Sequence, residues 1–347
     1  MDSSKFYSFS LDIVEVPILL LYSVIFIANI RQLRRLSPSS FLIFFLCLGD
    51  AIHSINEFII SLTLVLTGAN DYNKQACQFQ AAIITFGVIF SFCQGTGLTL
   101  IRYLAIVHNM KVRPHYAPTF TGASAAISAA VATLPFVLKS QDATYGLHPA
   151  RTVCTVMWWQ TDSETRLVSL ICGFVLAINV CFMGFAYPAI YFRASKALNE
   201  AKESTLDSTM PSVEGGSQTD LSQTNLQPIS KSKNNLQQTV KGSSILADKN
   251  LTAPSKKLPV QTTLGNQVRE YEQKQKHLLM QSVAIVSAML VGWGVYFGMA
   301  FIELFSGQPA RVEVEMVADA LVVANELLNP ILVLIFDLEI RAPDSTS

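Results

Sequence analysis

The chain has 347 residues, of which 50% are hydrophobic and only 14% are charged. Its 25 Lys and Arg balance its 25 Asp and Glu, so the charge gives no reason to expect a nucleic acid or another strongly charged partner. One soluble domain has no need of many separate apolar runs of about 20 residues, the length that spans a bilayer as a helix. The composition therefore favours a membrane protein.

Seven such runs follow one another along the sequence. None alternates between apolar and polar residues as the strands of a membrane barrel do, so we predict an all-α, seven-transmembrane helical bundle. The predicted spans are residues 13–30, 41–66, 78–107, 119–138, 167–192, 278–305 and 312–336.

Charges around the first span predict the orientation of the bundle. Asp12 and Glu15 lie at its start, whereas Arg31, Arg34 and Arg35 follow it, which is the reverse of a cleavable signal peptide. The basic residues of the later loops also gather on one side of the membrane. We therefore expect the N-terminus outside and the C-terminus in the cytoplasm. We also predict a multi-pass protein of the plasma membrane.

The composition changes sharply after the fifth span. Residues 193–276 are rich in Ser, Thr, Gln, Asn and Lys and have almost no aromatic residues. Such a segment buries too little apolar surface to offset the entropy of ordering, so we predict a long, largely disordered third cytoplasmic loop whose ends extend the flanking helices. The predicted organisation is helices one to five in residues 1–192, this loop, helices six and seven in 277–336, and a short cytoplasmic tail in 337–347.

Six cysteines are present. Four lie inside predicted helices, where a small apolar residue is the simple interpretation: Cys47, Cys93, Cys172 and Cys181. Cys77 and Cys154 are the two that the topology places on the outer face, where disulfides form. We expect a bond between them, with two free thiols as the alternative.

Short motifs occur in a fixed order along the predicted helices. They are Leu46-Cys47-Leu48-Gly49-Asp50, Cys77, Arg102-Tyr103-Leu104-Ala105-Ile106, Trp293 and Asn329-Pro330. Each is weak alone, but together they span nearly the whole chain and resemble the motifs of rhodopsin-like (class A) G-protein-coupled receptors. The resemblance implies that Arg102, Tyr103, Tyr191, Trp293 and Pro330 serve activation and G-protein coupling.

The sequence also departs from this family. Ile101 stands where the family has an acid before the arginine, and Gln275 occupies a sixth-helix position that often carries a second acid. Without these partners for Arg102 we expect raised basal activity. Val333 replaces the family's Tyr after Asn329-Pro330.

The family often binds a sodium ion in mid-membrane, and the resemblance assigns that site to Asp50, Ser91, Asn325 and Asn329. A plain interhelical hydrogen-bond cluster is the alternative. Glu326, an unusual residue at this depth, is expected close to Asp50. Two carboxyl groups in a medium of low dielectric constant cannot both ionise cheaply, so we expect the pair to hold a proton when no ion is bound and signalling to depend on sodium and pH. Glu315 is expected at the wet end of this helix.

The family's ligand pocket corresponds here to Ile84, Val88, Tyr296, Phe297, Ala300 and Asp319. Ile84 replaces the acid that pairs with amine ligands, and Val323 stands where a lysine would bind retinal covalently. An amine receptor and an opsin are therefore disfavoured, and no covalent cofactor is expected.

We therefore predict a receptor that transmits an extracellular or intramembrane small ligand to a heterotrimeric G protein. The third cytoplasmic loop is expected to be phosphorylated by a kinase and to dock an arrestin-like protein, and lipid surrounds the bundle. We identify no nucleophile–base pair and no Cys/His metal constellation, which argues against an enzyme. The alternative is a transporter or channel with the polar core as its solute pathway, although paired inverted repeats are not apparent.

Overall fold

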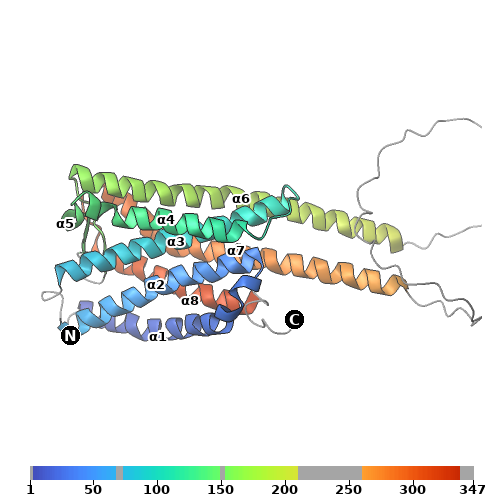
Figure 1. Cartoon of the computed structure of the whole chain (residues 1–347), viewed down its shortest axis with the longest axis horizontal. Coiled ribbons are helices and arrows are strands. Elements are labelled where there is room, and N and C mark those ends of the chain that lie inside the picture. Colours follow the sequence, from blue (N-terminus) through green and yellow to red (C-terminus); the bar gives the residue numbers. More distant parts are fainter. Residues whose placement is uncertain (1–2, 68–72, 149–152, 210–259, 337–347) are drawn as a thin grey trace, which may run out of the picture. The chain divides into compact units, whose positions relative to one another are not determined.

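The computed structural model describes residues 3–67, 73–148, 153–209 and 260–336. Seven of the described helices are long and apolar enough to cross a membrane, which confirms the predicted all-α bundle (Figure 1). They are α1 (Ser3–Asn29), α2 (Pro38–Thr67), α3 (Lys74–Ile106), α4 (Tyr116–Val137), α6 (Ser163–Thr209), α7 (Val260–Ser306) and α8 (Val312–Phe336).

Local sequence signals explain several helix ends. A short 3-10 helix, η1 (Ile30–Arg35), links α1 to α2, which begins at Pro38, a residue whose fixed φ suits the first helical turn. The side chain of Asn73 caps α3 by accepting hydrogen bonds from the backbone N–H groups of Gln75 (2.8 Å) and Ala76 (3.3 Å).

The described chain divides into two compact units, Met1–Asn199 with Tyr271–Ser347 and Glu200–Glu270. The bundle belongs to the first. Helix α6 continues to Thr209 and α7 begins at Val260, so both ends of the predicted third loop are helical, as expected from their Ala, Glu, Lys and Gln content. Residues 210–259 lie outside the described part of the chain, and so does the predicted tail at 337–347.

Helices α2 and α3 approach each other closely because two glycines meet at their crossing. A Cβ atom on Gly49 would lie 2.3 Å from Ser91 Oγ, and one on Gly87 would lie 3.2 Å from the carbonyl oxygen of Gly49. This close approach brings Ser91 of α3 beside the segment of α2 that carries Asp50. Small residues at a helix crossing are the usual basis of tight packing in membranes.

A β-hairpin covers the end of the bundle that holds the disulfide, called here the disulfide end. Helix α5 (Gln141–Thr144) leads into β1 (Tyr145–Leu147), which pairs antiparallel with β2 (Cys154–Val156) in the register Tyr145 to Val156. The predicted disulfide joins Cys77 at the start of α3 to Cys154, with Cα atoms 5.4 Å apart. The sequence did not predict the hairpin, since three-residue strands are too short to show an alternation.

Besides the disulfide, a group of ion pairs around His148, called here the His148 clasp, holds the hairpin to the α7–α8 turn. His148, which follows β1, forms ion pairs with Glu303 of α7 (Nε2 to Oε1, 3.4 Å) and with Glu315 of α8. Glu303 Oε1 also accepts a hydrogen bond from the backbone N–H of Ala310 (2.6 Å). Glu315 was expected at the water-exposed end of its helix. This prediction is wrong, because Glu315 is buried beneath the clasp and only 1% exposed. The side chains of His148, Glu303 and Glu315 are all buried, and the indole of Trp159 packs edge to face against His148. Little water can therefore reach the three groups.

Substitution of Gly49 by Ala is expected to lower the melting temperature of the detergent-solubilised protein. The added methyl group meets Ser91 at the tightest point of the α2–α3 crossing, and such overpacking costs about 1–3 kcal/mol. Gly122→Ala in α4 is the matched control, since nothing lies within 4 Å of the new Cβ atom. Equal melting temperatures for the two variants would refute the close crossing.

The His148 clasp predicts a loss of stability at alkaline pH. Burial alone would lower the pKa of His148, but the hydrogen bonds and charges of Glu303 and Glu315 outweigh it and raise the pKa from 6.5 to about 9. The stabilisation is therefore complete below about pH 6.5, where His148 is protonated in the folded and unfolded chain, and is lost as pH rises to about 9.

Thermal unfolding between pH 6 and 10 measures this effect, which is on the order of 1–3 kcal/mol. His148→Gln is expected to be less stable than the wild type at the acid end and to converge with it at the alkaline end. His108→Gln serves as a control at the other end of the bundle. Parallel curves for the wild type and His148→Gln would show that the clasp does not titrate.

Candidate functional site

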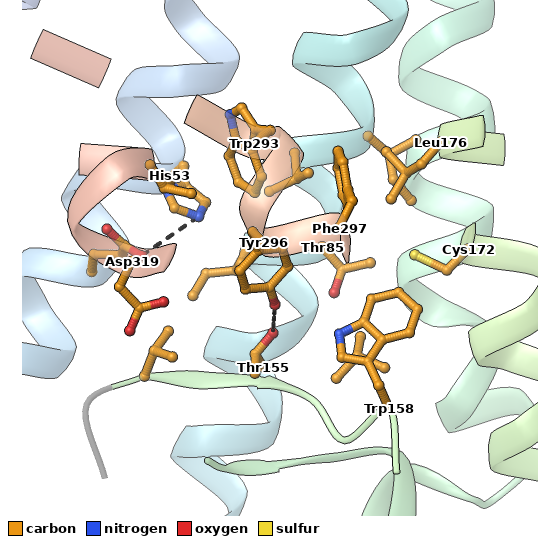
Figure 2. Close-up of a pocket in the computed structure, with 17 residues that line it drawn as sticks. His53, Thr85, Thr155, Trp158, Cys172, Leu176, Trp293, Tyr296, Phe297 and Asp319 are labelled. Atoms are coloured by element: carbon orange, nitrogen blue, oxygen red, sulfur yellow. Dashed lines mark hydrogen bonds and ion pairs between the residues drawn. The ribbon is translucent and has the colours of Figure 1, made fainter. Parts of the chain in front are cut away.

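Most of the residues predicted to form the ligand pocket line a cavity beneath the hairpin (Figure 2). Five of the six predicted pocket residues line it: Ile84, Val88, Tyr296, Phe297 and Asp319. The hairpin and the segment that follows it supply Thr155 and Trp158, and the Thr155 hydroxyl is hydrogen-bonded to the Tyr296 hydroxyl at 3.0 Å. The cavity measures about 40 Å³, so as it stands it accommodates a few water molecules or a small ligand group.

The sixth predicted residue, Ala300, lines a second and larger cavity of about 270 Å³. Apolar side chains of α6 and α7, including Leu176, Val180 and Met289, form most of its wall. The structure therefore distributes the predicted pocket over two neighbouring cavities, one with acidic residues and one apolar. Four residues line both: Trp158, Leu176, Trp293 and Phe297.

Trp293 connects the two cavities with the polar interior of the bundle. Its indole stacks on Phe297 at a centroid distance of 5.7 Å and meets Phe92 edge to face at 5.8 Å. On its other side it meets the imidazole of His53 at 5.6 Å. A group that enters either cavity therefore contacts the same tryptophan that contacts the buried histidine.

The predicted sodium ligands lie deeper in the bundle, at the junction of α2, α3 and α8. Asn329 donates a hydrogen bond from Nδ2 to Asp50 Oδ2 at 2.8 Å, so these two are brought together. Ser91 donates to the backbone carbonyl of Leu46 at 3.4 Å, one helical turn before Asp50. Asn325 is 2% exposed, and its Oδ1 atom has no hydrogen-bond partner among the described residues.

Glu326 faces the interior of the bundle, but its partners are two residues that sequence reasoning missed. Its carboxylate forms an ion pair with His53 Nδ1 and accepts a hydrogen bond from Ser54 Oγ at 2.5 Å. The other imidazole nitrogen of His53 lies 3.7 Å from Glu57 Oε1. His53, Glu57 and Glu326 place their ligand atoms within 4.8 Å of one another, a grouping that the sequence did not predict.

A signal for this cluster was present in the sequence. His53 and Glu57 are four residues apart inside the second predicted span, so both point to one face of the helix. A lone histidine in an apolar segment is more often a core residue, so the pair alone does not indicate a site. The structure adds Glu326 from α8, which no local pattern in α2 reveals.

Carboxyl groups dominate the electrostatics of this region. Asp50 and Glu326 interact electrostatically, and Glu57 interacts with Glu326, Asp319 and Glu15 of α1. His53 is the one basic side chain among the residues described as lining the cavity. Charges at this depth are costly in lipid, so an excess of carboxyl groups needs protons or bound cations for compensation.

Apart from Trp293, the predicted activation residues lie toward the opposite end of the bundle. Arg102 is buried near the end of α3, and Tyr103 packs against His108 and Phe185. Tyr191 is 55% exposed, whereas Tyr187, one turn earlier on α6, packs against the core. Pro330 is buried in α8, and the side chain of Gln275 lies outside the described part of the structure.

Comparison with known proteins accords with this arrangement. Residues 22–332 match the model of the family described as "7 transmembrane receptor (rhodopsin family)". The structure is similar to the crystal structure of squid rhodopsin, with a TM-score of 0.66 over 98% of this chain and 82% of the squid protein. The two sequences are 14% identical, so the likeness concerns the fold. A search of curated proteins finds no matching sequence.

Proposed function

Since this chain belongs to the rhodopsin family of seven-transmembrane receptors, we propose that it transmits the binding of a small ligand to a heterotrimeric G protein. The family makes the chain a multi-pass membrane protein and a G-protein-coupled receptor rather than an enzyme. We place it in the plasma membrane, and the charge distribution predicts that the disulfide end lies outside. The observation that carries the proposal is the contact of Trp293 with both cavities and with His53.

The ligand that fits best is a small molecule with an apolar body. The larger cavity has almost entirely apolar walls, and its volume of about 270 Å³ is close to the lower end of ligand pockets. Cys181 and Phe301 in its wall are exposed on the face that lipid covers, so an intramembrane route of entry is available. Val323 stands at the position of a retinal-binding lysine, which supports a non-covalent ligand.

Ligand binding would act on the bundle by shifting a two-state equilibrium. A ligand that displaces Trp293 changes the packing of α7 against Phe92 of α3 and His53 of α2. The activated bundle would expose Arg102 and Tyr103 to the G protein, while Pro330 provides a flexible point in α8. Phosphorylation and arrestin-like docking are proposed for the third loop.

The core would act as the sodium- and proton-sensitive element of this equilibrium. Each of the four predicted sodium ligands offers a side-chain oxygen: Asp50, Ser91, Asn325 and Asn329. Oxygen ligands suit a hard cation such as sodium. Sodium bound between α2, α3 and α8 would hold the inactive packing, and protons would compete with it for the carboxyl group of Asp50. A plain hydrogen-bond cluster is the alternative for this region.

Nucleotide exchange on a promiscuous G protein tests the proposal with the full-length protein in lipid nanodiscs. Basal exchange is expected above that of empty discs, because Ile101 stands where the family has an acid. Sodium is expected to suppress this exchange at least severalfold relative to choline at equal ionic strength. Asp50→Asn should abolish the sodium effect. Asp142→Asn, at an exposed aspartate paired with Lys74, should retain it.

The outcomes separate the alternatives. If nucleotide exchange by the wild type does not respond to sodium, the proposal of a receptor stands and the proposal of a sodium site is refuted. Absence of exchange together with solute flux through the same protein in vesicles would overturn the receptor in favour of a transporter or channel.

A further inference from the structure

His53, Glu57 and Glu326 form a compact buried cluster that the sodium site does not use. His53 and Glu57 lie one turn apart on α2, and Glu326 projects toward them from α8. The ligand atoms of all three lie within 4.8 Å of one another. His53 and Glu326 are 3% and 1% exposed, and the side chain of Glu57 is 15% exposed.

The charge of the cluster favours a divalent cation. Two carboxylates face one imidazole here, and Asp50, Asp319 and Glu15 add further acidic groups around them. With a neutral imidazole, a divalent ion would balance the charges of Glu57 and Glu326. A proton on His53 balances only one of them, and a buried charge without compensation is costly in the membrane interior.

The chemistry of the ligand atoms narrows the choice of ion. Sodium, magnesium and calcium take oxygen ligands, whereas an imidazole nitrogen combined with two carboxylates is a typical set for zinc and neighbouring first-row ions. Ser54 holds Glu326 through its hydroxyl at 2.5 Å, which is the kind of support that metal-binding carboxylates receive. This ligand set differs from that of Asp50, Ser91, Asn325 and Asn329.

The cluster also has room beside it for a further ligand. His53 and Glu57 line the small cavity beneath the hairpin, and its volume of about 40 Å³ provides room for metal-bound water. We propose that His53, Glu57 and Glu326 form a binding site for a divalent transition-metal ion of the zinc class, with its remaining coordination position facing this cavity. Such an ion would tie α2 to α8 directly beneath Trp293.

Cobalt provides a spectroscopic test, because Co²⁺ in a nitrogen- and oxygen-ligated site has visible absorption that zinc abolishes on displacement. Full-length protein in nanodiscs, stripped with a chelator and then dialysed, is titrated with Co²⁺ and then with Zn²⁺. The expected result is one Co²⁺ per protein, displaced by one Zn²⁺, and a higher melting temperature with either ion.

Variants locate the ion. His53→Ala, Glu57→Gln and Glu326→Gln are each expected to weaken Co²⁺ binding by at least about tenfold. Glu57→Gln alters the most exposed of the three groups, so it provides the test if either of the other variants fails to fold. His115→Ala, an exposed histidine next to α4, is the matched control and should bind Co²⁺ as the wild type does.

The Asp50→Asn variant separates this proposal from the sodium site. It should lose the sodium effect on nucleotide exchange while keeping the cobalt spectrum. No bound Co²⁺ in the folded wild type, or undiminished binding in the variants at Glu57 and Glu326, would overturn the metal site without bearing on the receptor.

Discussion

The main physical constraint on this protein is the cost of carboxyl groups buried in a membrane-spanning bundle. Where α2 meets α8, two acidic side chains are held by partners from the other helix: Asp50 by Asn329, and Glu326 by His53 and Ser54. Tyr22 of α1 adds a hydrogen bond from its hydroxyl to the backbone carbonyl of Glu326 at 3.1 Å. These contacts fix the rotation of three helices about their axes, since any other rotation would turn a charge toward lipid.

A chain of contacts connects this interior with the hairpin at the disulfide end. Thr155 of β2 is hydrogen-bonded to Tyr296, whose ring meets Trp293 at 5.7 Å, and Trp293 meets His53 at 5.6 Å. The disulfide and the His148 clasp hold the hairpin at its two strands, through Cys154 and the end of β1. The hairpin, the two cavities and the aromatic side chains around Trp293 therefore lie between the disulfide end and the buried carboxyl groups of Asp50 and Glu326. This arrangement is suited to converting ligand binding into a change in helix packing.

Much of this architecture could be predicted from the sequence because lipid imposes simple rules. Apolar runs of sufficient length specify the helices, and the order of the motifs specifies the family. The disulfide followed from placing Cys77 and Cys154 on one side of the membrane. The six predicted pocket residues all line one of two neighbouring cavities.

The features that the sequence did not reveal depend on tertiary contacts. The hairpin strands are too short for a period-two pattern, and Glu315 is buried only because the hairpin brings His148 over it. Glu326 was expected beside Asp50 from its position along α8. The two carboxyl groups do interact electrostatically. The direct partner of Glu326 is nevertheless His53, three residues after Asp50 on α2, because of the way α2 and α8 are rotated and spaced.

A double-mutant cycle on His53 and Glu326 tests the α2–α8 contact most directly. Thermal unfolding of the wild type, His53→Ala, Glu326→Gln and the double variant is measured in nanodiscs with a chelator present, so that no metal contributes. Removing one member of a buried ion pair typically costs about 3–5 kcal/mol, because the other is left without its partner. The account predicts that the double variant is more stable than the sum of the single changes implies, by roughly 0.5–3 kcal/mol. Strictly additive effects would contradict it.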